Sequence, residues 1–410
     1  MSIEITDHFK SQIEEASREA TKNILSSMSS LFEENKLFDV TDKNSKEYIV
    51  ASSLSHLKDA WSYFGQSINA ILKNDTSLSK HLSYYSELRS SLSLMATEGI
   101  AIYNDEHYYI DKYENVQQFT RESGSMNKLG THQMIWVSLD AWSMLPKSRE
   151  LLEKIIHIEG KSLKEWIEAC DYTKWSGLSH EIYKNIGIDL KYIAHDREMR
   201  NSVSYSPIDT FMRTCSIESN VEFILKLWDL LEPNFKKTDF SILKKSISLI
   251  GCEDPSYAID TLIENNSLKE AIKEYLSEQE NMVFEKSSIV HENLNDALND
   301  PENHLQMLGR AFLLLRVATG SVKLLLKDAN IEFSDISFWS EKILDEYGLV
   351  KNKNELDSYS DMWMDVEEGA IQQISDNDTN TDFFTLKQEL SYPFLLLSET
   401  QRPLLWGIEY

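Results

Sequence analysis

The sequence predicts an all-α fold of two packed helical bundles, with one small β-hairpin inserted near residues 100–110. The first observation behind this prediction is a scarcity of turn-forming residues, since the 410 residues include only 13 glycines and 7 prolines. Because sheet-rich folds need many Gly and Pro turns, this scarcity favours long helices with few connections. The second observation is that apolar residues recur three and four positions apart through most of the chain, which is the spacing of a helix face.

Three helices are predicted before residue 100. The first is expected over 7–34 and the second over the stretch from Leu54 to Ile71, and each carries an apolar stripe that can face a core. Residues 81–98 form the third helix, which we expect to be central because its Ser and Ala side chains let neighbouring helices approach closely. The stripes are Ile13, Ala16, Ala20, Ile24, Met28 and Leu31 in the first helix, and Leu54, Leu57, Trp61, Phe64, Ile68 and Ile71 in the second.

The segment IAIYNDEHYYI (100–110) predicts the hairpin, because two short β-prone runs flank Asn104-Asp105-Glu106. His107 is expected on an exposed edge strand. Helical signals return at Thr131, the expected N-cap of the next helix. They continue through LLEKIIHI, where His157 is expected to be at least partly buried, and then through LKEWIEA, 189–205 and 219–233.

A domain boundary is predicted at the charged run that begins at Lys236. It divides the chain into an N-terminal helical bundle of residues 1–235, which contains the hairpin, and a second helical bundle of residues 236–410. The second bundle is expected to contain helices over 239–250, 256–280, 302–329, 335–347 and 357–374. The polar run 375–382 is expected to be a surface loop. The apolar segment from Ser391 onward is expected to pack onto the protein.

Composition excludes several classes of function. There are 67 acidic and 41 basic residues, and the resulting net charge of −26 disfavours RNA binding over a broad face. The odd set Cys170, Cys215 and Cys252 is no disulfide framework and fits a reducing cytosol. No secretory leader or membrane span is recognisable, so we expect a cytoplasmic protein without membrane contact. Neither a metal-ligand spacing nor a glycine-rich nucleotide motif occurs, so no metal and no cofactor are expected.

The most informative segment is DLKYIAHDREMRNSVSYSP (189–207). Arg197 and Arg200 are three positions apart, and Asn201 lies four beyond Arg197, so a helix places all three on one face. Two arginines this close in an acidic chain require anionic partners, either the chain's own carboxylates or a phosphate. His195 and Tyr205 lie within the same three helical turns.

Arg200-Asn201 followed by Tyr205 resembles the Arg-polar-x(3–5)-His signature of HEPN domains. The upstream segment HLSYYSELRSSLSLMATEG resembles the tyrosine-bearing early helix of those domains. The resemblance extends at most over residues 50–235. HEPN domains are helical bundles, usually dimeric, that are common in prokaryotic toxin–antitoxin, CRISPR-linked and phage-defence systems. Their active members are metal-independent ribonucleases.

The resemblance implies roles for the residues that match. Arg200, together with Arg197, would hold a phosphate, and Asn201 would orient the catalytic groups. The position of the histidine, however, holds Tyr205. An imidazole with a pKa near ~6.5 exchanges protons at neutral pH, whereas a phenol near ~10 is a poor base there. His195 could take the role, but it precedes Arg200 and so departs from the order of the motif.

The sequence therefore predicts a HEPN-like defence or toxin–antitoxin protein that acts mainly through protein interaction, with weak or absent ribonuclease activity. A protein partner is expected, a homodimer is an open alternative, and RNA remains a partner that the charge disfavours. The competing interpretation is a scaffold or subunit of a multi-protein complex unrelated to nucleases, in which an Arg/Asn/Tyr network only joins helices.

Three further side chains have both a structural and a functional interpretation. Arg89 and Arg316 lie on apolar stripes and are expected to form internal ion pairs, since buried arginines need carboxylate partners. His132 follows Gly130-Thr131 at an expected helix start. The local dipole there favours anions, although an ordinary capped helix start has the same sequence.

Overall fold

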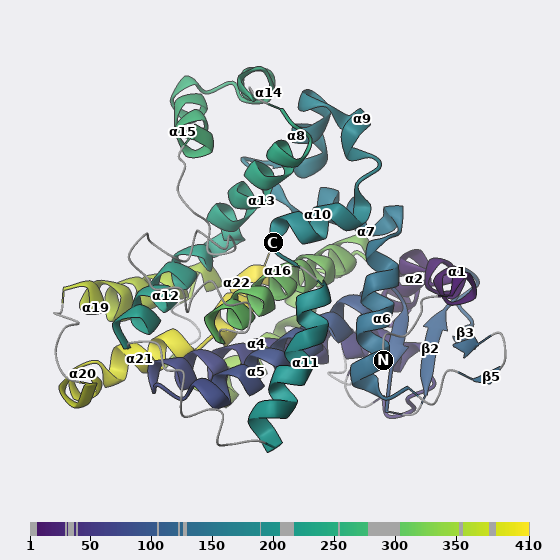
Figure 1. Cartoon of the computed structure of the whole chain (residues 1–410), viewed down its shortest axis with the longest axis horizontal. Coiled ribbons are helices and arrows are strands. Elements are labelled where there is room, and N and C mark those ends of the chain that lie inside the picture. The colour runs from purple at the N-terminus through teal and green to yellow at the C-terminus, as the bar shows by residue number, and fades with distance from the viewer. Residues whose placement is uncertain are drawn as a thin grey trace.

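The computed structural model describes residues 6–28, 31, 37, 40–104, 106–121, 124–125, 129–188, 190–205, 217–252, 255–277, 304–351, 356–376 and 383–409. These residues are mostly helical, which confirms the all-α fold with a small β insertion (Figure 1). The helices are α1 (Asp7–Glu15), α2 (Arg18–Ser27), α4 (Lys46–Leu72), α5 (Thr76–Thr97), α6 (Thr131–Ser143), α7 (Pro146–Ile155), α8 (Leu163–Cys170), α9 (Tyr172–Trp175), α10 (Ser179–Ile186), α11 (Leu190–Tyr205), α12 (Ile217–Leu230), α13 (Lys236–Leu249), α14 (Ser256–Leu262), α15 (Asn266–Ser277), α16 (His304–Asp328), α17 (Ser337–Tyr347), α18 (Met362–Val366), α19 (Gln373–Ser375), α20 (Phe383–Glu389), α21 (Ser391–Ser398) and α22 (Gln401–Ile408). Shorter helical turns are η3 (Pro233–Phe235), η5 (Phe333–Ile336), η7 (Tyr359–Asp361) and the π-helical η8 (Glu367–Gln372).

The long helices α4, α5 and α16 pack against one another at the centre of the fold. All six apolar residues of the stripe predicted for α4 are buried. The expected central position of α5 is also confirmed, because most of its serines are buried and two of them donate hydrogen bonds to the backbone of α4. The Ser86 hydroxyl donates to the carbonyl of Ala60 at 3.0 Å, and the Ser93 hydroxyl donates to that of Ser53 at 2.8 Å.

The first predicted helix is interrupted. Instead of one helix over 7–34, the chain forms α1 and α2 with a break at Ala16-Ser17. The Ser17 side chain caps α2 by accepting from the Ala20 N–H at 3.2 Å. Its own N–H donates at 2.9 Å to the carbonyl of Ile110. The Ser17 N–H is therefore bonded to the neighbouring strand and does not form the hydrogen bond that a continuous helix would require.

The hairpin at 100–110 is confirmed, because β1 (Ile100–Ile102) pairs antiparallel with β2 (His107–Ile110). A third strand, β3 (Val116–Gln118), pairs with the other edge of β2. His107 therefore lies on a central strand and is fully buried, with its Nε2 2.8 Å from the carbonyl oxygen of Leu129. The expectation of an exposed edge histidine is wrong because the sequence pattern did not reveal the third strand.

Two smaller hairpins complete the strands of the described residues. β4 (Thr120–Arg121) pairs with β5 (Gly124–Ser125), and β6 (His157–Ile158) pairs with β7 (Lys161–Ser162). The run LLEKIIHI therefore leaves the helix after Ile155, and the side chain of His157 is exposed rather than buried. Glu159 and Gly160 form the turn with φ of 50° and 75°, the left-handed pair of a type I′ hairpin turn.

Helices from both sides of residue 235 share one hydrophobic core. α16, α21 and α22 all pack against α4, and α22 buries Leu404, Leu405 and Trp406. The expected packing of the C-terminal segment is therefore confirmed. The predicted helices over 256–280 and 357–374 are each divided, the first into α14 and α15 and the second into η7, α18, η8 and α19. Of the expected polar loop, residues 377–382 lie outside the described residues.

Two further findings concern the described part of the chain only. None of its helices is long and apolar enough to cross a membrane. Cys170 and Cys252 are both free thiols, although their side chains are hydrogen-bonded to each other. Cys215 lies outside the described residues.

Candidate functional site

The helix α11 carries all five residues that the sequence singled out. It packs against α5 and α6, as Figure 1 shows, and it also contacts α16. Arg197, Arg200 and Asn201 are each half-buried. His195 and Tyr205 also lie on α11, but their side chains are outside the described part of the structure. The three described side chains are therefore the ones from which a site can be built.

A buried ion pair fixes α11 to the centre of the fold. Arg310 of α16 donates to both carboxylate oxygens of Asp196, from Nε at 2.9 Å and from Nη2 at 2.7 Å. A second carboxyl group, that of Glu87, lies 3.8 Å from the same guanidinium. Burial and the adjacent Asp196 raise the pKa of Glu87 well above its usual range, which favours the neutral form of this carboxyl group. Arg310 and Asp196 thus pair with each other within the core, and neither is available to bind a ligand.

Arg200 lies over two aromatic rings of α5. Its guanidinium carbon is 5.2 Å from the ring centroid of Tyr84 and 5.8 Å from that of Tyr85, which is cation–π geometry. The Nε of Arg200 is buried and makes no hydrogen bond to the described residues. Neither Arg200 nor Arg197 forms an ion pair within that part of the chain. Of the two anionic partners that the sequence left open, carboxylates of the described residues therefore pair with neither arginine.

His132 lies beside these arginines, in the first turn of α6. Its Nδ1 is 2.8 Å from the Tyr84 hydroxyl, and the two rings stack with centroids 5.7 Å apart. Burial lowers the pKa of His132, and the nearby guanidinium groups of Arg200 and Arg197 lower it further. Gly130 is the N-cap of α6, without a side-chain cap, so the expectation that Thr131 caps the helix is wrong.

A second histidine, His81, has a related environment one turn before the tyrosines. Its ring is 4.9 Å from that of Tyr85, and its pKa is lowered by burial and then by Arg200. Both histidines are therefore neutral imidazoles at pH 7, close to permanent positive charge. We call Arg197, Arg200, His81, His132, Tyr84 and Tyr85 the α5–α6–α11 cluster.

The other two arginines singled out from the sequence have internal partners. Arg316 is buried and donates to both carboxylate oxygens of Asp239, so the expected ion pair is confirmed. Arg89 is half-buried, with Nη1 2.9 Å from His56 Nδ1 and 3.5 Å from an oxygen of Asp59.

The sequence pattern predicts only part of the α5–α6–α11 cluster. It placed Arg197 and Arg200 on one helix face and noted His132 separately, but it did not single out His81. The available signal was the spacing within α5, because His81 and Tyr85 are four positions apart and so lie on one helix face. No local pattern could bring His81, His132 and Arg200 together, since they come from three helices.

Comparisons with protein-family models, with curated proteins and with solved structures give no match. Among the described residues, no group of three or more His, Cys, Asp or Glu side chains is arranged to hold a metal ion. The geometry of the α5–α6–α11 cluster is thus the basis for a functional assignment.

The cluster combines two chemical capabilities. Guanidinium groups without a carboxylate partner bind phosphate oxygens through charge-assisted hydrogen bonds. A neutral imidazole next to them can accept a proton, because the positive charges that lower its pKa also keep it unprotonated at neutral pH. Phosphate binding rests on Arg197 and Arg200, and proton transfer rests on His132 with the Tyr84 hydroxyl as its hydrogen-bond partner.

Proposed function

We propose that the protein is a cytoplasmic, HEPN-like member of a prokaryotic defence or toxin–antitoxin system that binds an RNA phosphate in the α5–α6–α11 cluster. The observation that supports this proposal best is that Arg197 and Arg200 lack ion-pair partners among the described residues of a chain with net charge −26. Carboxylates are abundant in such a chain, so arginines kept away from them are available to an external anion. A focused site also avoids the repulsion that the rest of the surface exerts on RNA.

Within this proposal, ribonuclease activity is weak or absent, because the motif position of the histidine holds Tyr205. His132 and His81 both lie near Arg200, and any cleavage would use His132, which is hydrogen-bonded to Tyr84, to exchange protons at the 2′-hydroxyl. Arg200 would bind the scissile phosphate, and Asn201, one position further along α11, would orient it.

Protein interaction is the main activity in this proposal, and exposed apolar side chains support it. Met364 of α18, Phe384 of α20, and Tyr392 and Leu395 of α21 are each more than half exposed. α21 contacts both α18 and α20, so these side chains belong to adjoining helices. Figure 1 shows α20 and α21 at one edge of the molecule. Clustered apolar side chains on a protein surface are typical of an interface with a partner. They also favour the alternative function, a helical scaffold within a multi-protein complex.

RNA binding tests the proposal directly. We expect a fluorescein-labelled single-stranded RNA to bind the wild type, and Arg200→Ala to weaken binding at least about tenfold, as the loss of a charge-assisted hydrogen bond implies. Arg197→Ala should also weaken binding and reduce its dependence on salt. Lys342→Ala is the matched control, because it removes an exposed cation from α17. Equal affinity of the wild type and both arginine variants would overturn the proposal, and absence of binding by the wild type would favour the scaffold.

Cleavage is tested separately in the presence of EDTA. Any cleavage by the wild type should be lost in both Arg200→Ala and His132→Ala. Cleavage that survives in His132→Ala would show that His132 does not transfer the proton.

A further inference from the structure

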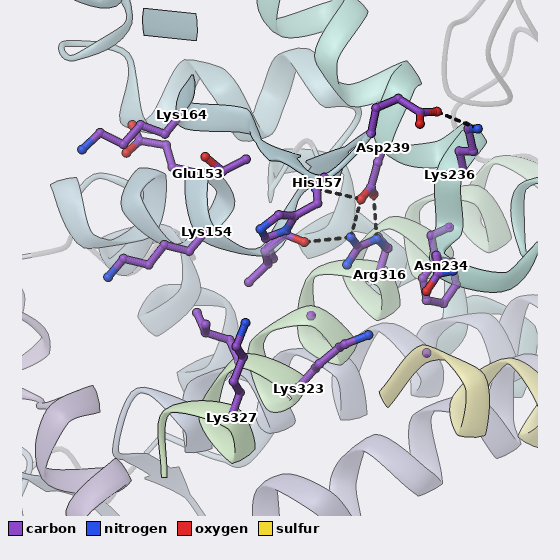
Figure 2. A pocket seen from close by; sticks show the side chains of 18 of the residues that line it. Glu153, Lys154, His157, Lys164, Asn234, Lys236, Asp239, Arg316, Lys323 and Lys327 are labelled. Carbon is purple, nitrogen blue, oxygen red and sulfur yellow. Dashed lines mark hydrogen bonds and ion pairs between the residues drawn. The ribbon is translucent and has the colours of Figure 1, made fainter. Parts of the chain in front are cut away.

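A pocket of about 700 Å³ lies among α7, α8, α13 and α16 (Figure 2). None of its lining residues belongs to α5, α6 or α11, so it is separate from the α5–α6–α11 cluster. Its volume falls within the range of roughly 300–1,000 Å³ that is typical of small-molecule sites. The pocket is therefore large enough for a metabolite but too small to be a groove for a macromolecule.

The lining of this pocket is basic, although the whole chain is strongly acidic. Five lysines and one arginine face it, against four carboxylates. Three of the carboxylates have cationic partners, since Asp239 pairs with Arg316, Glu159 with Lys236 at 2.6 Å, and Glu153 with Arg149 at 3.1 Å. The fourth, Asp328, is exposed.

Lys164 and Lys236 form ion pairs with Glu168 and Glu159, but the other three lysines of the lining do not pair with a described carboxylate. Lys154 and Lys327 are exposed and form no ion pair with the described residues. Lys323 is half-buried, and its Nζ donates to the backbone carbonyl oxygen of Glu409 at 2.6 Å. A carbonyl oxygen carries no formal charge, so the ammonium of Lys323 is not neutralised. Lys323 and Lys327 are four positions apart and rise from the same face of α16 toward the pocket, as Figure 2 shows.

One wall of the pocket is held rigidly. The Arg316 guanidinium bonds to both oxygens of Asp239 at 2.9 and 2.8 Å and to the carbonyl of Ile155 at 2.9 Å. It also lies 5.1 Å above the ring of Phe235. Gly320 makes this packing possible, because a Cβ there would lie 2.7 Å from Nη1 of Arg316. The lysines therefore face a fixed surface rather than a flexible one.

Backbone strain concentrates around the same pocket. The described residues include six non-glycine residues with positive φ, and three of them line the pocket. Glu159 belongs to the type I′ hairpin turn described above, whereas the consecutive Asn234 and Phe235, at 65° and 51°, lie just before α13. Such a conformation costs a residue like Phe about 1–2 kcal/mol. Strained backbone of this kind is found preferentially at ligand sites, where the surrounding structure enforces it. This observation is independent of the charge of the lining.

We propose that the pocket binds a small molecule that carries a polyphosphate group, with Lys327, Lys323 and Lys154 as its cationic contacts. Lysine ammonium groups bind phosphate as point charges on flexible stems, so several of them can surround one multiply charged group. A nucleoside polyphosphate and an inorganic polyphosphate share this chemistry.

Isothermal titration calorimetry of the full chain with ATP and with tripolyphosphate tests the proposal. We expect one equivalent of ATP to bind the wild type, and the variant Lys323→Gln/Lys327→Gln to bind at least about tenfold more weakly. Lys327→Gln alone is also informative, because this exposed side chain makes no contact that folding requires. Lys342→Gln removes the same charge from α17 and should leave the affinity unchanged.

The two probes identify the source of the phosphate. Binding of both shows that the polyphosphate itself is recognised, and binding of ATP alone shows that the nucleoside contributes. The proposal is overturned if neither probe binds the wild type, or if the lysine variants bind as tightly as the wild type does. Arg200→Ala should leave ATP affinity unchanged, so this result is independent of the outcome of the RNA experiments.

Discussion

Asp196, Glu87 and Arg310 should respond to substitution as a coupled unit. The single guanidinium of Arg310 faces two buried carboxyl groups: it donates hydrogen bonds to Asp196, and the pKa of Glu87 is raised well above its usual range. When Asp196→Asn removes the first charge, the main cause of the raised pKa of Glu87, after burial, also disappears. Glu87 can then ionise and take over the pairing with Arg310. The core remains neutral in charge, and α11 loses only part of its attachment to α16.

The magnitudes follow from this exchange. Asp196→Asn loses charge-assisted hydrogen bonds but keeps Arg310 paired, so we expect a loss of about 1–2 kcal/mol of unfolding free energy. Because the raised pKa of Glu87 favours its neutral form, Glu87→Gln replaces this carboxyl group by a neutral amide of similar shape and should cost less than about 1 kcal/mol. The double variant leaves Arg310 buried without any counter-charge, which should cost about 3–5 kcal/mol. The double variant is thus expected to lose about 2 kcal/mol more than the two single losses together.

Urea unfolding at pH 7, followed by far-UV circular dichroism, measures all four free energies of this cycle. Glu264→Gln is a control, because it removes the charge of an exposed acidic residue between α14 and α15. Additivity of the two single losses to within about 0.5 kcal/mol would refute the reasoning, since it would mean that Glu87 does not replace Asp196.

Three further predictions concern other parts of the molecule. Burial lowers the pKa of His304 from 6.5 to about 3, so as the pH falls the unfolded chain protonates this imidazole before the folded protein does. The free energy of unfolding, measured with urea, should therefore be about 2 kcal/mol lower at pH 5 than at pH 7 because of His304 alone. This part of the loss should be absent in His304→Gln. Gly65→Ala should destabilise the protein by about 1–3 kcal/mol in thermal unfolding, because the new Cβ would clash with the last carbonyl of α21, whereas Gly177→Ala enters open space and should be neutral. Burial and the neighbouring thiol raise the pKa of Cys170 to about 12, so mass spectrometry should find it alkylated by iodoacetamide at pH 8 far more slowly than a free cysteine.

The sequence predicted the parts of the fold that depend on local periodicity. The apolar stripe of α4 is buried as predicted, because a buried helix face requires that spacing. Arg316, which lies within an apolar run, pairs with the carboxylate of Asp239 as expected. The β6–β7 hairpin was missed because strands of two residues leave no alternating pattern. The interruption between α1 and α2 was missed because its cause is the contact of Ser17 with a strand more than ninety residues away.

Only those features of the candidate site that depend on local spacing were predictable from the sequence. Arg197 and Arg200 share one helix face by spacing alone, so their proximity followed from the sequence. Their lack of carboxylate partners among the described residues did not, because Arg310 of another helix pairs with Asp196 and the pKa of Glu87 is raised. The pocket of Figure 2 was not predictable either, since its lysines come from α7, α8, α13 and α16.

Helix α16 contacts α5 and α11, which carry most of the α5–α6–α11 cluster, and it also lines the pocket. Arg310 near its start fixes α11, Arg316 forms a wall of the pocket, and Lys327 near its end faces the same pocket. At about 1.5 Å per residue, Arg310 and Lys327 lie roughly 25 Å apart on one continuous helix. A ligand that displaced α16 along its axis would therefore move both Arg310, which holds α11, and Lys327, which lines the pocket. Reciprocity of binding free energies then requires that each ligand change the affinity for the other by the same factor.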